Sequence, residues 1–171
     1  MIVSPFHNST IYPLKIYLLS HIIRIEKINE GVNEMKIAVS ATAGSMDAMV
    51  DMRFGRCAYF VIVEVEGNEI KSHEVIQNPS VTAMRGAGIQ AAQIIANKGV
   101  EVLITGNIGP NAFNVLSSIG IKIVAGVGGI TVRDAVQRYL RGELKATRTP
   151  TTFGFGLGRG MGRGMGRGRR W

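Results

Sequence analysis

The sequence predicts an α/β fold, with a mixed five-stranded sheet covered by helices on both faces. Two observations predict it. Runs with strand-like and helix-like patterns follow one another in the order strand, strand, strand, helix, strand, helix, strand, helix. A glycine-rich turn also precedes each helical stretch. A meander followed by strand–helix alternation places antiparallel strands beside parallel ones in a single sheet.

The first three strands are expected at residues 36–41, 59–66 and 69–77. A long polar loop, residues 42–57, separates the first two and holds four charged residues, namely Asp47, Asp51, Arg53 and Arg56. Gly67-Asn68 forms a tight hairpin turn before the third strand. In this third strand, polar and apolar residues alternate enough to suggest that one face is exposed to solvent. Asn78-Pro79 ends the strand.

Helices are expected to alternate with strands through the rest of the chain. The first helix runs from about Ile89 to Asn97, after the turn Gly86-Ala87-Gly88. Val100 to Ile104 contains a short β-branched run, which is typical of a strand buried on both faces. The next helix runs from Pro110 to about Ser118, because proline suits the first helical position.

The last strand and helix are expected between Ile121 and Gly142. Residues 121–125 form the strand, and a turn of four residues, Gly126 to Gly129, follows it. Thr131 caps the final helix, whose apolar residues recur at helical spacing, namely Val132, Ala135, Val136, Tyr139 and Leu140. After this helix, Thr147 to Thr152 is expected to be a linker around Pro150.

The positive charge of the chain is concentrated near its C-terminus. The formal net charge is +8, and residues 153–171 hold five arginines and no acidic residue. Residues 1–34 carry no net charge, because their three basic and three acidic residues cancel. The middle of the chain therefore carries a net charge of +3, an ordinary value for a folded domain. Most of the basicity therefore belongs to a Gly/Arg/Met-rich tail, residues 147–171, which we expect to be disordered.

Residues 1–34 do not resemble the rest of the chain. Their apolar run, Ile16 to Ile23, is far shorter than the roughly 20 residues of a membrane-spanning helix, so we expect no stable membrane insertion. We predict that Met35 is the true start, that residues 1–34 are an upstream leader or poorly ordered, and that the domain spans residues 35–146. A single cysteine, Cys57, excludes an intrachain disulfide and favours a cytoplasmic location.

The three glycine-rich turns are expected on or near one edge of the sheet. Right-handed crossovers place the loops after the first, fourth and fifth strands at the edge where α/β proteins usually bind ligands. Helix starts offer free N–H groups and a partial positive charge there. Three arginines in nearby loops (Arg53, Arg56 and Arg85) would make this surface suited to an anion. The P-loop lysine and the GxGxxG motif are both missing, which argues against a nucleotide.

Five blocks of sequence occur in order between Met35 and Phe113. They are Met35-Lys36-Ile37-Ala38-Val39, Arg53-Phe54-Gly55-Arg56-Cys57 with Tyr59-Phe60, Asn78-Pro79, Gly86-Ala87-Gly88-Ile89-Gln90-Ala91-Ala92, and Gly106-Asn107-Ile108-Gly109-Pro110-Asn111-Ala112-Phe113. Together they resemble the dinitrogenase iron–molybdenum cofactor-binding family, which includes NifX-like nitrogenase accessory proteins and the orange protein. The resemblance covers about Met35 to Leu144.

This resemblance implies a ribonuclease-H-like three-layer fold and a small carrier or assembly factor that is not an enzyme. The implied cargo is an anionic iron–sulfur or molybdenum-containing metal–sulfur cluster, held transiently. The implied partners are cluster-assembly or client metalloproteins, and we expect a monomer or weak homodimer. The expected cofactor-binding residues are Arg53, Arg56, Cys57, Gly86, Gly88, Gly106, Asn107, Gly109 and Gly128.

Two alternatives stay open for Cys57, which is either a soft metal ligand or a small buried residue at the start of a strand. Some relatives carry a histidine between the Asn-Pro and Gly-Ala-Gly blocks, whereas Ser80 to Arg85 holds none. The first strand, KIAVSA, lacks the carboxylate that two-metal nucleases need, so we expect no nuclease activity.

The tail leaves three interpretations open. It solubilises the protein, binds RNA through its arginines with Trp171 stacking on a base, or offers the thioethers of Met161 and Met165 to copper(I) or a cluster. The chain as a whole has two alternatives to a cluster carrier. One is a nucleic-acid-binding module acting through the tail, and the other is a regulatory partner-binding domain without a ligand.

Overall fold

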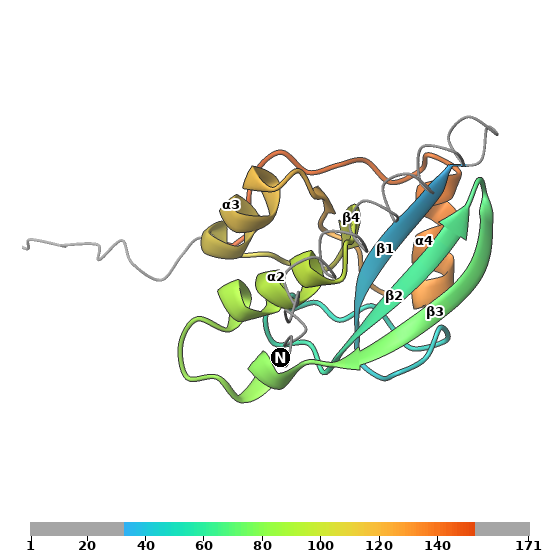
Figure 1. The fold of residues 1–171 in the computed structure, drawn as a ribbon. Helices are drawn as coiled ribbons and strands as arrows, with labels where there is room; N and C mark the ends of the chain where they lie inside the picture. Colours follow the sequence, from blue (N-terminus) through green and yellow to red (C-terminus); the bar gives the residue numbers. More distant parts are fainter. Residues whose placement is uncertain (1–32, 153–171) are drawn as a thin grey trace, which may run out of the picture.

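The sheet of the computed structural model, which describes residues 33–152, has the strand order β3–β2–β1–β4–β5 (Figure 1). The strands are β1 (Glu34–Ala41), β2 (Tyr59–Glu66), β3 (Glu69–Gln77), β4 (Val102–Ile104) and β5 (Lys122–Val124). β1, β2 and β3 form an antiparallel meander, whereas β4 pairs parallel with both β1 and β5. The predicted mixed five-stranded sheet is confirmed.

Three α-helices and a 3₁₀ helix complete the described part of the chain. They are η1 (Pro79–Thr82), α2 (Ala87–Asn97), α3 (Pro110–Ser118) and α4 (Val132–Leu140). α2 and α3 cover one face of the sheet and α4 covers the other, as predicted (Figure 1). α2 begins two residues before the predicted Ile89, directly after Gly86, whose φ of 73° is left-handed. η1 lies where a loop was expected, because the Asn78 side chain caps it by accepting from the Ser80 amide.

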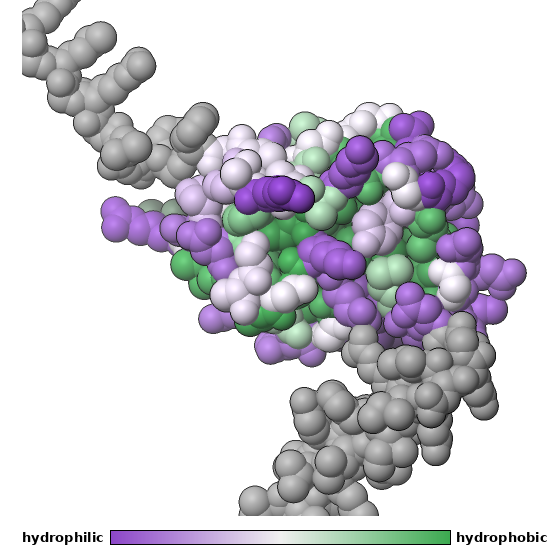
Figure 2. Space-filling view, turned by 90° about the horizontal axis from the view of Figure 1, so that it is seen from above, coloured by the Kyte–Doolittle hydropathy of each residue, from purple (hydrophilic) through white to green (hydrophobic). Residues whose placement is uncertain are grey.

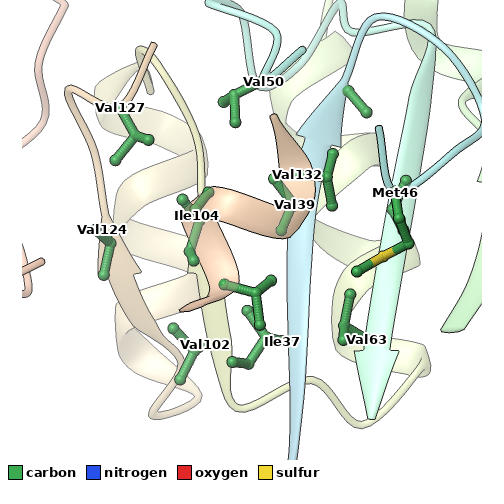
Figure 3. Packing of buried hydrophobic residues seen from close by; sticks show 14 of the residues in the cluster. Ile37, Val39, Met46, Val50, Val63, Val102, Ile104, Val124, Val127 and Val132 are labelled. Carbon is green, nitrogen blue, oxygen red and sulfur yellow. The ribbon is translucent and has the colours of Figure 1, made fainter. Parts of the chain in front are cut away.

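Side chains of the central strands alternate between two separate cores. Ile37 and Val39 of β1 pack in the core that α4 covers, together with Val132 (Figure 3). Ala38, which lies between them, belongs to the core under α2 and α3, together with Leu116. These buried positions leave β1 with no exposed face along its second half, which explains its continuous apolar run.

β3 forms one edge of the sheet and is mostly exposed, which confirms the predicted wet face. Lys71 on this strand lies within 3.6 Å of Glu66 and 3.0 Å of Glu69, so charged side chains line the edge. Figure 2 shows hydrophilic side chains around the rim of the molecule, with hydrophobic ones visible between them. None of the helices in residues 33–152 is long and apolar enough to cross a membrane.

Residues 147–152, expected to be a linker, hydrogen-bond to the domain and run from α4 toward α3 (Figure 1). The Thr147 amide donates to the Ile123 carbonyl at 2.6 Å, and its hydroxyl accepts from the Ala125 amide at 2.9 Å. Thr151 makes the same pair of bonds to one residue, Ile108. We call this segment the strap. It extends the folded domain beyond the predicted boundary at residue 146, whereas the predictions for the leader and for the tail after Thr152 lie outside the described residues.

Candidate functional site

The loop after β1 crosses the ends of the neighbouring parallel strands. Three isolated β-bridges mark the crossing, namely Val50 with Ala41 at the end of β1, Met49 with Thr131 before α4, and Arg53 with Asn107 after β4. The loops that follow β1, β4 and β5 are therefore joined at the carboxyl edge of these strands. This edge is where the sequence predicted a ligand site.

Gly106 is the point of closest approach in this crossing. Its amide donates to the Asp51 carbonyl at 3.2 Å, and the Asn107 amide donates to the Met52 carbonyl at 2.8 Å. A Cβ atom on Gly106 would lie 2.4 Å from the Met52 Cα, so no residue with a side chain fits without moving the backbone. Gly106 thus allows the crossing that positions Arg53.

The amides around Gly106 fall into two groups. Those of Gly106, Asn107 and Ile108 donate to protein oxygens and hold the loops in place. Among residues 33–152, the amides of Asn111 and Ala112 in the first turn of α3 have no hydrogen-bond partner. Such amides are the donors that a helix start offers to an anion.

The start of α2 lies against the start of α3. A Cβ on Gly88 would contact the Ala112 Cβ at 3.2 Å, so the two helices approach closely at their first turns. Gly55 packs on the same place, since its own Cβ would lie 2.8 Å from the Gly88 nitrogen. The Gly88 and Ile89 amides likewise have no partner within the described chain. We call residues 86–89 and 109–112 the paired helix starts.

The start of α4 has a different hydrogen-bond pattern. The amides of Val132 and Arg133 both donate, at 2.9 Å, to carbonyls of the loop after β1. The Asp134 amide donates to the Thr131 hydroxyl at 3.1 Å, which confirms the predicted cap. All three amides of this first turn therefore serve the fold.

Arg53 and Arg56 flank Phe54, a 1% exposed residue that anchors the loop against Phe60 with ring centroids 5.6 Å apart. The Arg53 side chain is 68% exposed, and its Nε lies 3.6 Å from an Asp51 carboxylate oxygen. The Arg56 guanidinium, also exposed, donates to a backbone carbonyl at 3.4 Å. Because Gly55 contacts the start of α2, the backbone of the segment that carries both arginines runs beside the paired helix starts.

Cys57 is fully buried where this loop joins β2. Its thiol donates to the Phe54 carbonyl at 3.2 Å, and the Asn78 side chain donates to the Cys57 carbonyl at 2.9 Å. Burial, and after it the negative charge of Asp51, raises the pKa of the Cys57 thiol to about 12, so the thiol is protonated at neutral pH. Metal ligation by Cys57 stays a prediction and requires both exposure and deprotonation of this thiol.

Met52 is a residue of this edge that the sequence did not single out. Its side chain lies over Gly128, a predicted site residue, because a Cβ on Gly128 would be 2.4 Å from the Met52 sulfur. Met52 is 48% exposed and Gly128 is also exposed, so the thioether lies at the surface beside Gly128. A methionine in a polar loop carries no sequence signal of this contact, which depends on the path of the loop.

The fold and the site define a small α/β protein whose carboxyl-edge loops bring glycine-rich helix starts and two arginines together. A sequence model of the family described as dinitrogenase iron-molybdenum cofactor matches residues 35–142. The chain therefore belongs to this family, which confirms the resemblance seen in the sequence.

Similar proteins extend over most of the described domain. The apo form of the orange protein from Desulfovibrio gigas is 42% identical with a TM-score of 0.65, and the match covers 69% of this chain and 97% of that one. A Thermotoga protein named as a NifB protein is 33% identical with a TM-score of 0.58, over 69% of this chain and 97% of that one. An uncharacterized protein of Methanocaldococcus jannaschii is 39% identical over 92 residues, which are 54% of this chain and 77% of that protein.

Proposed function

We propose that this protein is a small carrier or assembly factor whose cargo is an anionic iron–sulfur or iron–molybdenum-type cluster. The observation that carries the proposal is that the segment from Arg53 to Arg56 runs beside the paired helix starts, with Gly55 against Gly88 and the Arg53 backbone bridged to Asn107. Unpartnered amides and guanidinium groups together supply hydrogen-bond donors and positive charge, which both favour an anion. Membership of the dinitrogenase iron-molybdenum cofactor family supports the same class of cargo.

The donor set of the site suits binding through hydrogen bonds and charge. Within residues 33–152, no group of three or more His, Cys, Asp or Glu side chains is placed to hold a metal ion. A cargo held without metal–protein bonds is released without breaking them, which suits delivery to another protein. In this proposal the arginines and the glycines of the paired helix starts, Gly86, Gly88 and Gly109, contact the cluster, whereas Gly106, Asn107 and Gly128 position the loops around it.

The proposal includes the finer classification expected from the sequence. A ribonuclease-H-like fold is supported by the antiparallel β1–β2–β3 meander followed by the parallel strands β4 and β5. A non-enzymatic role in the cytoplasm is proposed with it, and β1 carries no carboxylate after its first residue, Glu34. The partners proposed on the basis of the family are nitrogenase-related metalloproteins that supply or receive the cluster.

Anaerobic loading tests this function. The full chain is incubated with iron and sulfide, with or without molybdate, desalted, and analysed for bound metal and sulfide. We expect uptake by the unmodified protein and at least about tenfold weaker retention by the R53Q/R56Q variant, because two charge-assisted contacts are lost. The matched control is R133Q/R138Q on α4, which removes the same charge and should load normally. Protein that takes up neither metal nor sulfide contradicts the proposed function.

A further inference from the structure

Asp51 is the only buried acidic residue within residues 33–152, and it lies next to an arginine of the proposed site. One oxygen of its carboxylate accepts from the Arg53 amide at 2.9 Å and lies 3.6 Å from the Arg53 Nε. In the described part of the chain, no other cation lies within ion-pair distance of this carboxylate. A buried carboxylate is costly unless hydrogen bonds and a positive charge compensate it. Arg53 supplies both to Asp51.

The backbone of Asp51 is held at the end of β1. Its amide donates to the Ser40 carbonyl at 2.8 Å, and its carbonyl accepts from the Ser40 hydroxyl at 3.0 Å and from the Gly106 amide at 3.2 Å. Ser40 is itself fully buried, and its hydroxyl lies 2.7 Å from the hydroxyl of Thr105, the residue after β4. Asp51 is therefore anchored to the ends of two strands, and its carboxylate stays in place when neighbouring side chains move.

The Arg53 side chain, in contrast, is loosely held. The backbone on either side of it is bonded to Asn107, because the Asn107 amide donates to the Met52 carbonyl at 2.8 Å and the Phe54 amide donates to the Asn107 carbonyl at 3.0 Å. The side chain itself is 68% exposed, and 3.6 Å between its Nε and the carboxylate is too long for a hydrogen bond. An ion pair of this kind is weak and exchanges partners with other anions. The guanidinium can therefore leave Asp51 for a bound anion, whereas Asp51 cannot follow it.

We propose that Asp51 is an internal competitor for Arg53, which pairs with Arg53 in the free protein and lowers the affinity of the site for an anionic cargo. This inference rests on the proposed function and adds a means of release to it. When the guanidinium contacts the cargo, Asp51 keeps its hydrogen bond to the Arg53 amide but loses the nearby positive charge. When the cargo leaves, the guanidinium returns to Asp51. The competition limits how tightly a carrier holds its cargo, because the contact with the cargo replaces an existing ion pair.

Binding of tetrathiomolybdate, a coloured metal–sulfide dianion, to the full-length chain tests this competition. The D51N variant keeps an oxygen that accepts from the Arg53 amide but removes the negative charge, and we expect it to bind about fivefold more tightly. A merely structural role of Asp51 predicts weaker binding instead. The matched control is D47N in the same loop, whose exposed carboxylate lies 3.3 Å from the Arg133 Nε on α4, and which should bind like the unmodified chain. In an R53Q background the gain from D51N should fall below about twofold, because no guanidinium is left to release.

A second measurement uses only the unmodified protein and so does not depend on the folding of any variant. The Nε–H resonance of Arg53 should shift in a saturable manner as tetrathiomolybdate is added, because the guanidinium exchanges one anionic partner for another. An unchanged resonance under conditions where the anion is bound overturns the inference.

The outcomes separate this inference from the proposed function. Equal or weaker binding by folded D51N, or a gain of the same size in the R53Q background, overturns the competition and leaves the proposed function standing. If the unmodified chain binds neither tetrathiomolybdate nor reconstituted clusters, the proposed function fails and this inference fails with it.

Discussion

The α4 start and the paired helix starts are built from similar glycine-rich sequence but use their amides differently. At α4, the amides of Val132 and Arg133 donate to loop carbonyls, and Thr131 caps Asp134. At α2 and α3, the first-turn amides within the described chain have no such partners. Neither of these two helices has a side-chain cap, whereas α4 has one.

The difference shows that a glycine-rich turn before a helix is not by itself a site. At α4 the loop after β1 supplies the oxygens that an anion would otherwise supply. At the paired helix starts the same loop contributes Gly55, which has no side chain to cover the amides, and an arginine on either side of the Phe54-Gly55 pair. The loop therefore supplies oxygen acceptors to the α4 start, whereas at the α2 start it packs Gly55 against Gly88 without accepting from its amide.

Replacing Gly106 by alanine should have the largest effect, because it breaks the crossing that creates both environments. The added Cβ would lie 2.4 Å from Met52 Cα, so the backbone must move. We expect G106A to lose about 3 kcal/mol or more of unfolding free energy in urea denaturation. The control is G109A, whose Cβ would make an ordinary 3.5 Å contact, and which should lose less than about 1 kcal/mol. Equal stability of the two variants would show that the crossing is not tight.

The pH dependence of stability tests the packing of the loop that carries the two arginines, because Cys57 lies buried where this loop joins β2. The folded protein raises the thiol pKa from 9.0 to about 12, so its stabilising effect is present below pH 9 and is lost as the pH rises from 9 toward 12. Between pH 9 and pH 10 the unmodified protein should lose about 1 kcal/mol more stability than C57A. Parallel pH profiles for the two proteins would mean that the thiol is not buried.

The C57A variant also tests metal ligation. Unchanged cluster loading by C57A would exclude ligation by Cys57, and lost loading would support it.

Removing the Thr131 cap of α4 should lower the unfolding free energy by a similar or smaller amount and should leave cluster loading unchanged. T131A removes the hydroxyl that accepts from the Asp134 amide, and we expect a loss of about 1 kcal/mol. T131S keeps an equivalent oxygen and should lose much less. Because the α4 start takes no part in the proposed cargo site, both variants should load clusters normally. A loading defect in T131A at a temperature where it remains folded would undo the distinction between the two regions.

The strap should give the smallest effect. T151V removes the hydroxyl that accepts from the Ile108 amide and keeps the shape of the side chain, so we expect a loss of up to about 1 kcal/mol. Hydrogen exchange at the Ile108 amide reports this bond directly and should become faster in T151V. Unchanged exchange would indicate that the strap does not hold Ile108 in solution.

Most of the fold could be predicted from local pattern. The β-branched run before Gly106, the Gly67-Asn68 turn and the Pro110 start each follow from residue-level preferences, and each lies where expected. The path of residues 49–54 could not be predicted, because it depends on a backbone contact between Met52 and Gly106, which are far apart in the chain. For the same reason the sequence indicated glycine-rich turns but not which of their amides the fold would use.

The strap shows a second limit of the sequence. Thr147 and Thr151 are polar residues near a proline, a composition typical of linkers. Their role depends on which carbonyls and amides remain unpaired at the edge formed by β5 and the loop after β4. That information belongs to the assembled sheet.

The most direct test of the central claim is to follow backbone amide resonances of the full-length protein while tetrathiomolybdate is added. We predict that the amides of Gly88, Ile89, Asn111 and Ala112 shift in a saturable manner, and that the amides of Val132, Arg133 and Asp134 do not. Shifts centred on α4, or none at any helix start under conditions where the anion is bound, would contradict the account.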